Sequence, residues 1–247
     1  MRLVAGKRVL FGLSTPDVVY YAYKGGRAFK EPLENLRAVV AGHTNHQQIM
    51  VLEKSPSKSV PELKGRRVSI GQPGSASEVI ATIILEGFGL KRGQDYKPEF
   101  LTFSEATTAL KDGTVDAITL ASGLPTPAII DLTTTHSVRF LPLPEEVGRN
   151  IVKEHGYYHL GVIKAGTYRG QTQDVPALAL GTVLVTHKET EEGLVYEVTK
   201  AILEHTAEIG EVHPAGKEWH LQNAVGGVAI PFHPGAARYL REKGALK

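Results

Sequence analysis

The sequence contains no cysteine, and other features that define common classes of protein are missing as well. Without cysteine the chain forms no disulfide and carries no thiolate nucleophile or thiolate metal ligand. No apolar stretch reaches the roughly 18 to 20 residues that cross a bilayer. Residues 1–8 show neither the apolar core nor the cleavage site of a signal peptide. The sequence therefore predicts neither a disulfide scaffold nor a membrane-spanning segment, and it leaves the compartment open.

Charge of one sign is not concentrated anywhere in the chain. The formal net charge is +2, and there is no basic run and no helix-turn-helix or zinc-finger spacing. Proteins that follow a phosphate backbone carry a basic patch or stripe. We therefore expect no nucleic acid among the partners.

The residue combinations of common hydrolases are also absent. There is no Gly-x-Ser-x-Gly elbow and no His-Glu-x-x-His pair. We assign no catalytic residue, expect no cofactor and do not expect an enzyme.

What is present is an ordinary globular composition in an α/β arrangement. The 247 residues are 42% hydrophobic and 22% charged, enough for one large domain or two of usual size. Short apolar runs alternate with helical periodicity, which indicates α/β layers. The expected strands are residues 9–13, 39–41, 49–53, 67–71, 99–101, 117–120, 138–142 and 180–186. The expected helices are residues 16–23, 60–63, 77–89, 104–111, 126–133, 144–155, 189–209 and 235–243.

Residues 67–78 have the pattern of a strand, a tight turn and a helix start. Pro73 and Gly74 suit the turn, Ser75 occupies an N-cap position, and Glu78 three residues later completes a capping-box pattern. The first amides of a helix lack partners and carry partial positive charge, so the segment 74–78, which also includes Ala76 and Ser77, is a candidate anion site. Capping alone accounts for Ser75 and Glu78 equally well.

The next segment has the pattern of a second strand–helix–strand unit. Thr102 and Glu105 form another capping-box pattern, Gly113 ends that helix, and residues 115–120 form a buried-looking strand. Together with residues 67–90, this order predicts a parallel sheet whose strand ends form a crevice.

Two other polar groups are candidates for ligand contacts. His43, Asn45 and Gln47 lie in a loop or at a strand end, where they serve as hydrogen-bonding groups or as a solvated loop. His43 and His46 have the spacing of a metal pair, but no third ligand is indicated, so we expect no metal. Asp17 with Ser14 and Thr15 could contact a ligand ammonium, or Ser14 or Thr15 could simply cap the helix that begins at Pro16.

Five separated segments occur in the order of one known family. They are residues 17–23, 59–78, 112–117, 123–125 and 230–239. Together they resemble the TAXI group of solute-binding proteins that serve tripartite (TRAP) transporters. Gly123 and Pro125 of this chain correspond to a Gly-x-Pro motif of that family. At the position of Ala76 the family often has glycine. The family's signal peptide, first strand and glycine-rich first loop have no counterpart here, so we expect the first lobe to be incomplete at its N-terminal end.

The resemblance implies a type II periplasmic-binding-protein fold with two α/β lobes. Residues 1–54 and 180–247 would form lobe 1, and residues 55–179 would form lobe 2. The implied site residues are Ser14, Asp17, His43, Asn45, Gln47, Gly74, Ser75, Ala76, Ser77, Glu78, Gly123 and Pro125.

The implied function is capture of a solute, not its conversion. The ligand would be a small carboxylate or amino acid such as glutamate, glutamine or 2-oxoglutarate, and the partner would be a membrane TRAP transporter facing the periplasm. Two alternatives stay open on the same scaffold: an enzyme of the transferase or thiamine-pyrimidine type, and an intracellular sensor.

Overall fold

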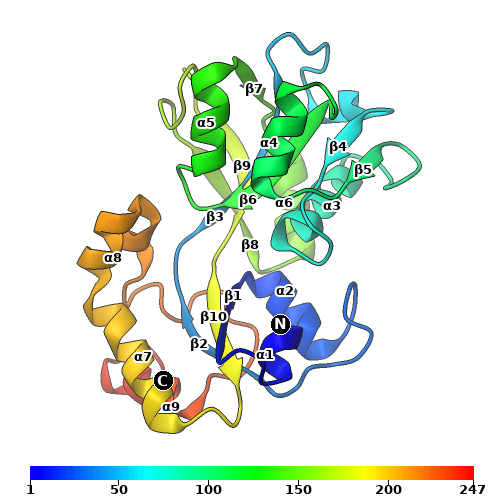
Figure 1. The fold of residues 1–247 in the computed structure, drawn as a ribbon. Coiled ribbons are helices and arrows are strands. Elements are labelled where there is room, and N and C mark those ends of the chain that lie inside the picture. Colours follow the sequence, from blue (N-terminus) through cyan, green and yellow to red (C-terminus); the bar gives the residue numbers. More distant parts are fainter. The chain divides into compact units, whose positions relative to one another are not determined.

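The computed structural model describes all 247 residues, and these form two compact units. Unit 1 consists of Met1–Thr44 and Leu180–Lys247, and unit 2 is the continuous segment Asn45–Ala179. The sequence places the first change of lobe near residue 54, whereas the compact units change between Thr44 and Asn45. Figure 1 shows the elements of each unit along the chain.

Unit 1 is built on a three-stranded antiparallel sheet. The strand order is β1 (Phe11–Ser14), β10 (Val183–His187) and β2 (Leu36–Ala41). The helices of this unit are α1 (Arg2–Ala5), α2 (Pro16–Lys24), α7 (Glu192–Glu204), α8 (Thr206–Val212), the 3-10 helix η2 (Pro214–Glu218) and α9 (Pro234–Glu242). Its core includes Val39, Val40, Val195, Trp219 and Leu240.

Unit 2 is built on a seven-stranded mixed sheet. Its strands are β3 (Asn45–Leu52), β4 (Arg67–Ser69), β5 (Lys97–Glu99), β6 (Ala117–Ser122), β7 (Val138–Phe140), β8 (Tyr158–Ile163) and β9 (Val175–Leu180). The order is β5-β4-β6-β3-β9-β8, with β7 paired to β3. As predicted, β4 runs parallel to β5 and β6; β3 runs antiparallel to β6.

The helices of unit 2 cover both faces of this sheet. They are η1 (Val60–Leu63), α3 (Ala76–Gly87), α4 (Phe103–Lys111), α5 (Pro127–Thr135) and α6 (Glu145–Glu154). The chain crosses from β4 to β5 through α3 and returns past β4 to β6 through α4. Right-handed crossovers in opposite directions place α3 and α4 on opposite faces. α5 packs beside α4, and α6 packs beside α3 (Figure 1).

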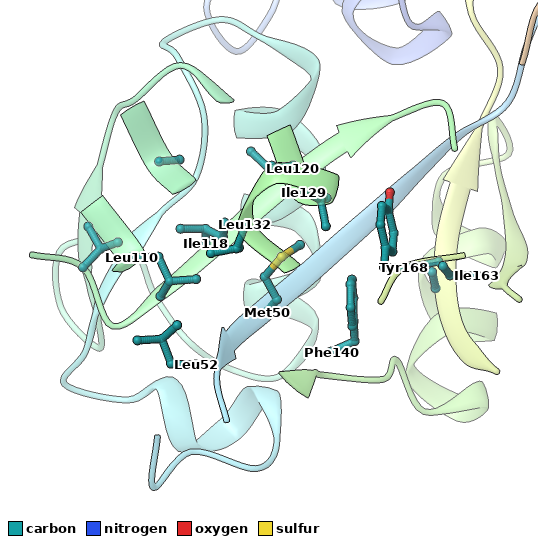
Figure 2. Packing of buried hydrophobic residues seen from close by; sticks show 13 residues of the cluster. Met50, Leu52, Leu110, Ile118, Leu120, Ile129, Leu132, Phe140, Ile163 and Tyr168 are labelled. Carbon is teal, nitrogen blue, oxygen red and sulfur yellow. The ribbon is translucent and has the colours of Figure 1, made fainter. Parts of the chain in front are cut away.

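The face under α4 and α5 is apolar along alternate positions of the strands. Met50 of β3 and Ile118 and Leu120 of β6 meet Leu110 of α4 and Ile129 of α5 in one buried cluster (Figure 2). Directly opposite residues of an antiparallel pair share a face. The intervening positions of β3 and β6 therefore face α3.

An ion pair connects the first residue of β4 to the residue before β6, in the parallel part of the sheet. The Arg67 guanidinium donates to both oxygens of Asp116, at 3.0 Å from Nε to Oδ2 and 2.9 Å from Nη2 to Oδ1. The Arg67 amide also donates to Asp116, at 2.8 Å. The hydrogen bond from the Arg67 side chain is the main reason that the pKa of Asp116 lies below its usual value. This contact ties β4 to the residue directly before β6.

Two elements are divided where the sequence predicts continuity. The predicted strand 180–186 contains the last residue of β9 and residues 183–186 of β10, with a turn between them in which the carbonyl of Thr182 accepts from Gly42 N at 2.8 Å. The predicted helix 189–209 is two helices, α7 and α8, interrupted at His205. Beside the interruption, the Thr206 hydroxyl donates to the carbonyl of Trp219 at 2.5 Å. Each break is accompanied by a contact with another part of the chain, which local periodicity does not encode. Helices α1 and η2 are not predicted from the sequence.

None of the helices combines the length and the apolar character that crossing a membrane requires.

Candidate functional site

The turn before α3 is shaped by two glycines. Gly71 and Gly74 have φ values of +91° and +72°, a region that residues with a Cβ rarely adopt. A Cβ added to Gly71 would lie 2.5 Å from the Cβ of Ser77 and 3.0 Å from the Ser75 hydroxyl oxygen. Glycine at position 71 therefore lets the turn fold closely onto the first turn of α3.

The predicted N-cap is confirmed, but the predicted capping box closes differently. Ser75 Oγ accepts a hydrogen bond from Glu78 N at 3.2 Å. The Glu78 carboxylate does not return to the amide of Ser75, which donates to the carbonyl of Gln72 at 3.0 Å. One carboxylate oxygen instead accepts from Gly74 N at 2.8 Å, and the other pairs with Arg92. The Thr102–Glu105 capping box, in contrast, forms as predicted.

Two amides of this segment remain available. The amides of Gly74, Ser75 and Glu78 are occupied by groups of the chain itself, so these three do not offer donors to a ligand. The amides of Ala76 and Ser77 make no hydrogen bond within the chain. They are the first two helical residues of α3, where the helix dipole favours a negative group.

The side chain of Ser77 anchors this helix start to the sheet. It is 3% exposed, and its hydroxyl accepts from Ala121 N at 3.0 Å. Ala121 lies near the end of β6, so the start of α3 lies at that end of the sheet. Ser77 therefore offers a ligand its amide, whereas its hydroxyl oxygen already accepts a hydrogen bond from the sheet.

Gln47 lies at the same end of the same face. It is directly opposite Ala121 in the β3–β6 pair, which puts the two Cα atoms about 5 Å apart. Gln47 belongs to the positions that face α3. Its side chain is 3% exposed, and neither Nε2 nor Oε1 has a hydrogen-bond partner in the protein. An amide buried in this way is uncommon in folded proteins, because it loses its hydrogen bonds to water without replacement.

The neighbouring Gln48 points to the other face and is fully bonded. Its Nε2 donates to Ser122 Oγ at 3.0 Å and to Thr126 Oγ1 at 2.9 Å. The Tyr168 hydroxyl donates to Gln48 Oε1 at 2.5 Å and accepts from Thr126 N at 2.8 Å. Burial raises the pKa of Tyr168, so the hydroxyl keeps its proton. Nothing in the sequence signals this network, because its members are widely separated along the chain.

The network holds the turn that contains Gly123 and Pro125. Thr126 Oγ1 donates to the carbonyl of Gly123 at 3.3 Å, and the Leu124–Pro125 peptide bond is cis. Gly123 directly follows β6 and Pro125 comes two residues later, at the sheet end that also holds Gln47 and the start of α3.

In unit 1, His43 is engaged by the protein itself. Its Nδ1 accepts from the indole Nε1 of Trp219 at 3.1 Å, and its Nε2 lies 3.2 Å from Thr182 Oγ1. With Nδ1 as an acceptor, the proton sits on Nε2, which donates to Thr182. Trp219 is 9% exposed and belongs to the core, so His43 satisfies its buried indole N–H.

The start of α2 holds the other predicted residues of unit 1. Asp17 is fully buried, and its Oδ1 accepts from Val18 N at 2.7 Å. The N-cap of α2 is Thr15, one of the two residues predicted to cap it, but its side chain makes no capping hydrogen bond. Ser14 ends β1 and is half-buried. Thr15 is 4% exposed, and its hydroxyl oxygen has no hydrogen-bond partner.

Asn45 and His46 begin β3 in unit 2. Asn45 is 7% exposed, and the ring of His46 lies against Gly161 of β8, where a Cβ would come within 2.9 Å of His46 Cδ2. No group of three or more His, Asp or Glu side chains is placed to hold a metal ion.

The predicted site residues are thus divided between the units. Ser14, Asp17 and His43 belong to unit 1. Asn45, Gln47, the segment 74–78, Gly123 and Pro125 belong to unit 2, where they share one end of the sheet.

The opposite end of the unit 2 sheet carries several surface hollows. One of ≈ 410 Å³ is lined by residues including Glu53, His136 and Arg169, near the C-terminal end of β3. Gln47 and the start of α3 lie at the other end of the strands. The hollows therefore do not coincide with the available amides.

The fold of the chain is that of type II periplasmic-binding proteins, as predicted. The periplasmic aliphatic sulphonate binding protein SsuA from Escherichia coli is similar in structure, with a TM-score of 0.52 and 20% identity over 97% of this chain. The alkanesulfonate-binding protein SsuA from Xanthomonas axonopodis pv. citri, solved bound to MOPS, gives a TM-score of 0.53 and 18% identity over 97% of this chain. This chain spans 64% of the first structure and 68% of the second.

The chain belongs to the NMT1-like family, whose sequence profile matches residues 1–244. A curated relative from Escherichia coli (strain K12), named as an aliphatic sulfonates-binding protein, is 42% identical over 69 residues. That match covers 28% of this chain and 21% of the relative.

The resemblance to the TAXI group of TRAP transporters is therefore wrong. Several residues of the motifs behind this resemblance have structural roles. Gly71, Gly74 and Ser75 form a strand–turn–helix junction, and Asp116 bonds Arg67. His233 caps α9. Such junctions, strand-to-strand ion pairs and helix caps recur in α/β folds, so they indicate the fold better than the family.

Proposed function

We propose that this chain is an extracytoplasmic solute-binding protein that delivers a small organic acid to a membrane transporter. The acid group binds at the start of α3, at the end of the unit 2 sheet. The named relatives are binding proteins for sulfonates, which supports capture over catalysis. TRAP subunits are no longer proposed as partners.

One observation carries this proposal. The amides of Ala76 and Ser77 are without partners, and the buried amide of Gln47 is without partners at the same end of the same face. Helix N-termini bind anions through their free amides and the helix dipole. These three nitrogens are donors without an acceptor, and an oxyanion supplies the acceptors.

The charge near the helix start is compatible with an anion. Glu78 brings a carboxylate to the first turn, but Arg92 pairs with it and limits its repulsion. The side chain of Glu78 is 14% exposed, whereas that of Arg92 is 39% exposed. A ligand acid therefore binds the free amides close to the Glu78 carboxylate, whose charge is already balanced by Arg92.

The head group is a sulfonate or a carboxylate. Three donor nitrogens match the three oxygens of a sulfonate, and the relatives' names favour that group. Nothing in the comparisons favours glutamate, glutamine or 2-oxoglutarate, so these ligands are not proposed here.

The proposal is tested by removing one donor amide without removing the helix. In Ala76→Pro the amide N–H is lost at the first helical position, where proline is favoured. Ser75, with φ −82° and ψ 160°, already has the conformation that a residue before proline prefers. We expect ethanesulfonate and propanoate to bind the wild type in titration calorimetry, and the variant to bind the tighter of them roughly tenfold more weakly, about 1–2 kcal/mol.

The matched control is Glu145→Pro. It places proline at the first position of α6, in the same unit but not among the proposed donors. We expect this control to bind like the wild type. Unchanged affinity in Ala76→Pro, or no binding of any small acid to the folded wild type, would contradict the proposal.

A further inference from the structure

The unpaired amide of Gln47 is the least expected feature of unit 2, because burial leaves both its donor and its acceptor without a partner. The neighbouring glutamine shows how a buried side-chain amide is hydrogen-bonded in this fold when its role is structural only. Gln48, the next residue, makes three hydrogen bonds with Ser122, Thr126 and Tyr168. The fold thus satisfies one glutamine completely and leaves its neighbour unsatisfied.

An amide offers two kinds of group at once. Nε2 carries two N–H donors, whereas Oε1 is an acceptor only. The oxygens of an acid can accept from Nε2, but they offer nothing to Oε1. The acceptor therefore requires a separate O–H or N–H group.

Resting on the proposed function, we propose that Gln47 makes the site selective for acids that also carry a hydroxyl or amine. The acid oxygens accept from Gln47 Nε2 and from the amides of Ala76 and Ser77. The hydroxyl or amine donates to Gln47 Oε1. Both unsatisfied atoms of the buried amide then have partners. An acid without such a donor leaves Oε1 unpaired, and this weakens its binding.

The proposal also explains why an apolar residue does not occupy position 47. Methionine has nearly the same length and shape as glutamine and places no polar group in the interior. An unpaired buried amide weakens the ligand-free protein, so its presence fits a role that is fulfilled when a ligand binds.

The experiment compares matched ligands on wild type and Gln47→Met by titration calorimetry. The ligands are ethanesulfonate, 2-hydroxyethanesulfonate and 2-aminoethanesulfonate, with propanoate and 3-hydroxypropanoate as the carboxylate pair. We expect the wild type to bind the hydroxyl or amine compound at least tenfold more tightly than its plain analogue. In Gln47→Met this preference should fall below threefold, and ethanesulfonate itself should bind more weakly, because Gln47 Nε2 no longer donates to its acid group.

Stability supplies a second readout, with Gln48→Met as the contrast. Gln47→Met should keep or raise the urea midpoint of the ligand-free protein, whereas Gln48→Met should lower it because Ser122, Thr126 and Tyr168 lose a partner. A drop in Gln47→Met as large as in Gln48→Met would overturn the proposal. So would a wild type without preference, or a preference that persists in Gln47→Met. Absence of binding by every acid, in contrast, would refute the proposed function itself.

Discussion

The core of unit 1 packs closely against Trp219 because Gly42 has no side chain. A Cβ placed on Gly42 would lie 2.3 Å from two indole carbons of Trp219, closer than atoms can approach. The indole also donates to His43, the residue after Gly42. The backbone therefore lies flat against the ring, and the hydrogen bond fixes the ring in that position.

Gly42→Ala should lower the free energy of unfolding of unit 1 by about 1–3 kcal/mol, because the added methyl group overpacks the core. Trp219 is the only tryptophan of the chain, so its fluorescence in urea follows the unit that contains it. Gly181→Ala is the control, since a Cβ there meets nothing within 4 Å. Equal midpoints for the two variants would contradict this packing.

Individual residues were predicted well where their role is local. Ser75 caps α3 and Thr102 caps α4, because capping depends on a few neighbouring positions. The sequence also indicates Gln47 as a polar group at a strand end. It does not indicate that His43 bonds Trp219, since their contact spans 176 positions.

At the scale of the element, α9 shows how burial makes a helix cap sensitive to acid. His233 is 1% exposed and its Nδ1 accepts from Gly235 N at 3.3 Å, so it caps α9 in the neutral form. Burial lowers the pKa of His233, an effect that backbone carbonyls of Thr190 and Lys188 partly oppose. Burial also lowers the pKa of His187 in β10.

The sign of the resulting pH dependence follows from linkage. Well above about pH 6.5 both histidines are neutral in the folded and unfolded chain, so they contribute no slope there. Below that pH the unfolded chain takes up protons that the folded chain resists, so stability falls as the pH falls toward the folded pKa values. We expect the urea midpoint reported by Trp219 to decrease between pH 7 and pH 5.

His233→Asn should reduce that decrease. The asparagine oxygen still accepts from the helix amide, so the cap is retained, and the side chain no longer takes up a proton. The measurement is the pair of urea midpoints at pH 7 and pH 5 for variant and wild type. The same decrease in both proteins would show that His233 does not cause it.

Elements were predicted more reliably than their continuity. The strand–helix–strand order around α3 and α4 and the parallel pairing follow from periodicity, turn residues and the handedness of crossovers. The break at His205 and the division between β9 and β10 do not follow, and at each of them the chain contacts a residue outside the segment, Trp219 or Gly42.

For the molecule as a whole, the two units differ in how the chain builds them. Unit 2 is one continuous segment with its own buried cluster on one face of its sheet, whereas unit 1 requires both ends of the chain (Figures 1 and 2). The two-unit α/β fold was predicted through a resemblance to the wrong family. It was correct because such folds share their strand–turn–helix junctions across families.

This difference predicts that residues 45–179 fold on their own. The segment has the size of a typical domain, and it contains the cluster around Met50, Leu120 and Ile129 and the network of Gln48. We expect the isolated segment to unfold in one cooperative transition in urea, followed by circular dichroism. It should also bind the tightest of the tested acids, because Gln47, Ala76 and Ser77 all belong to it. Any affinity lost relative to the full chain measures the contribution of groups outside unit 2. A folded segment without measurable affinity would place the essential donors elsewhere, and an unfolded segment would show that unit 2 depends on unit 1 for its stability.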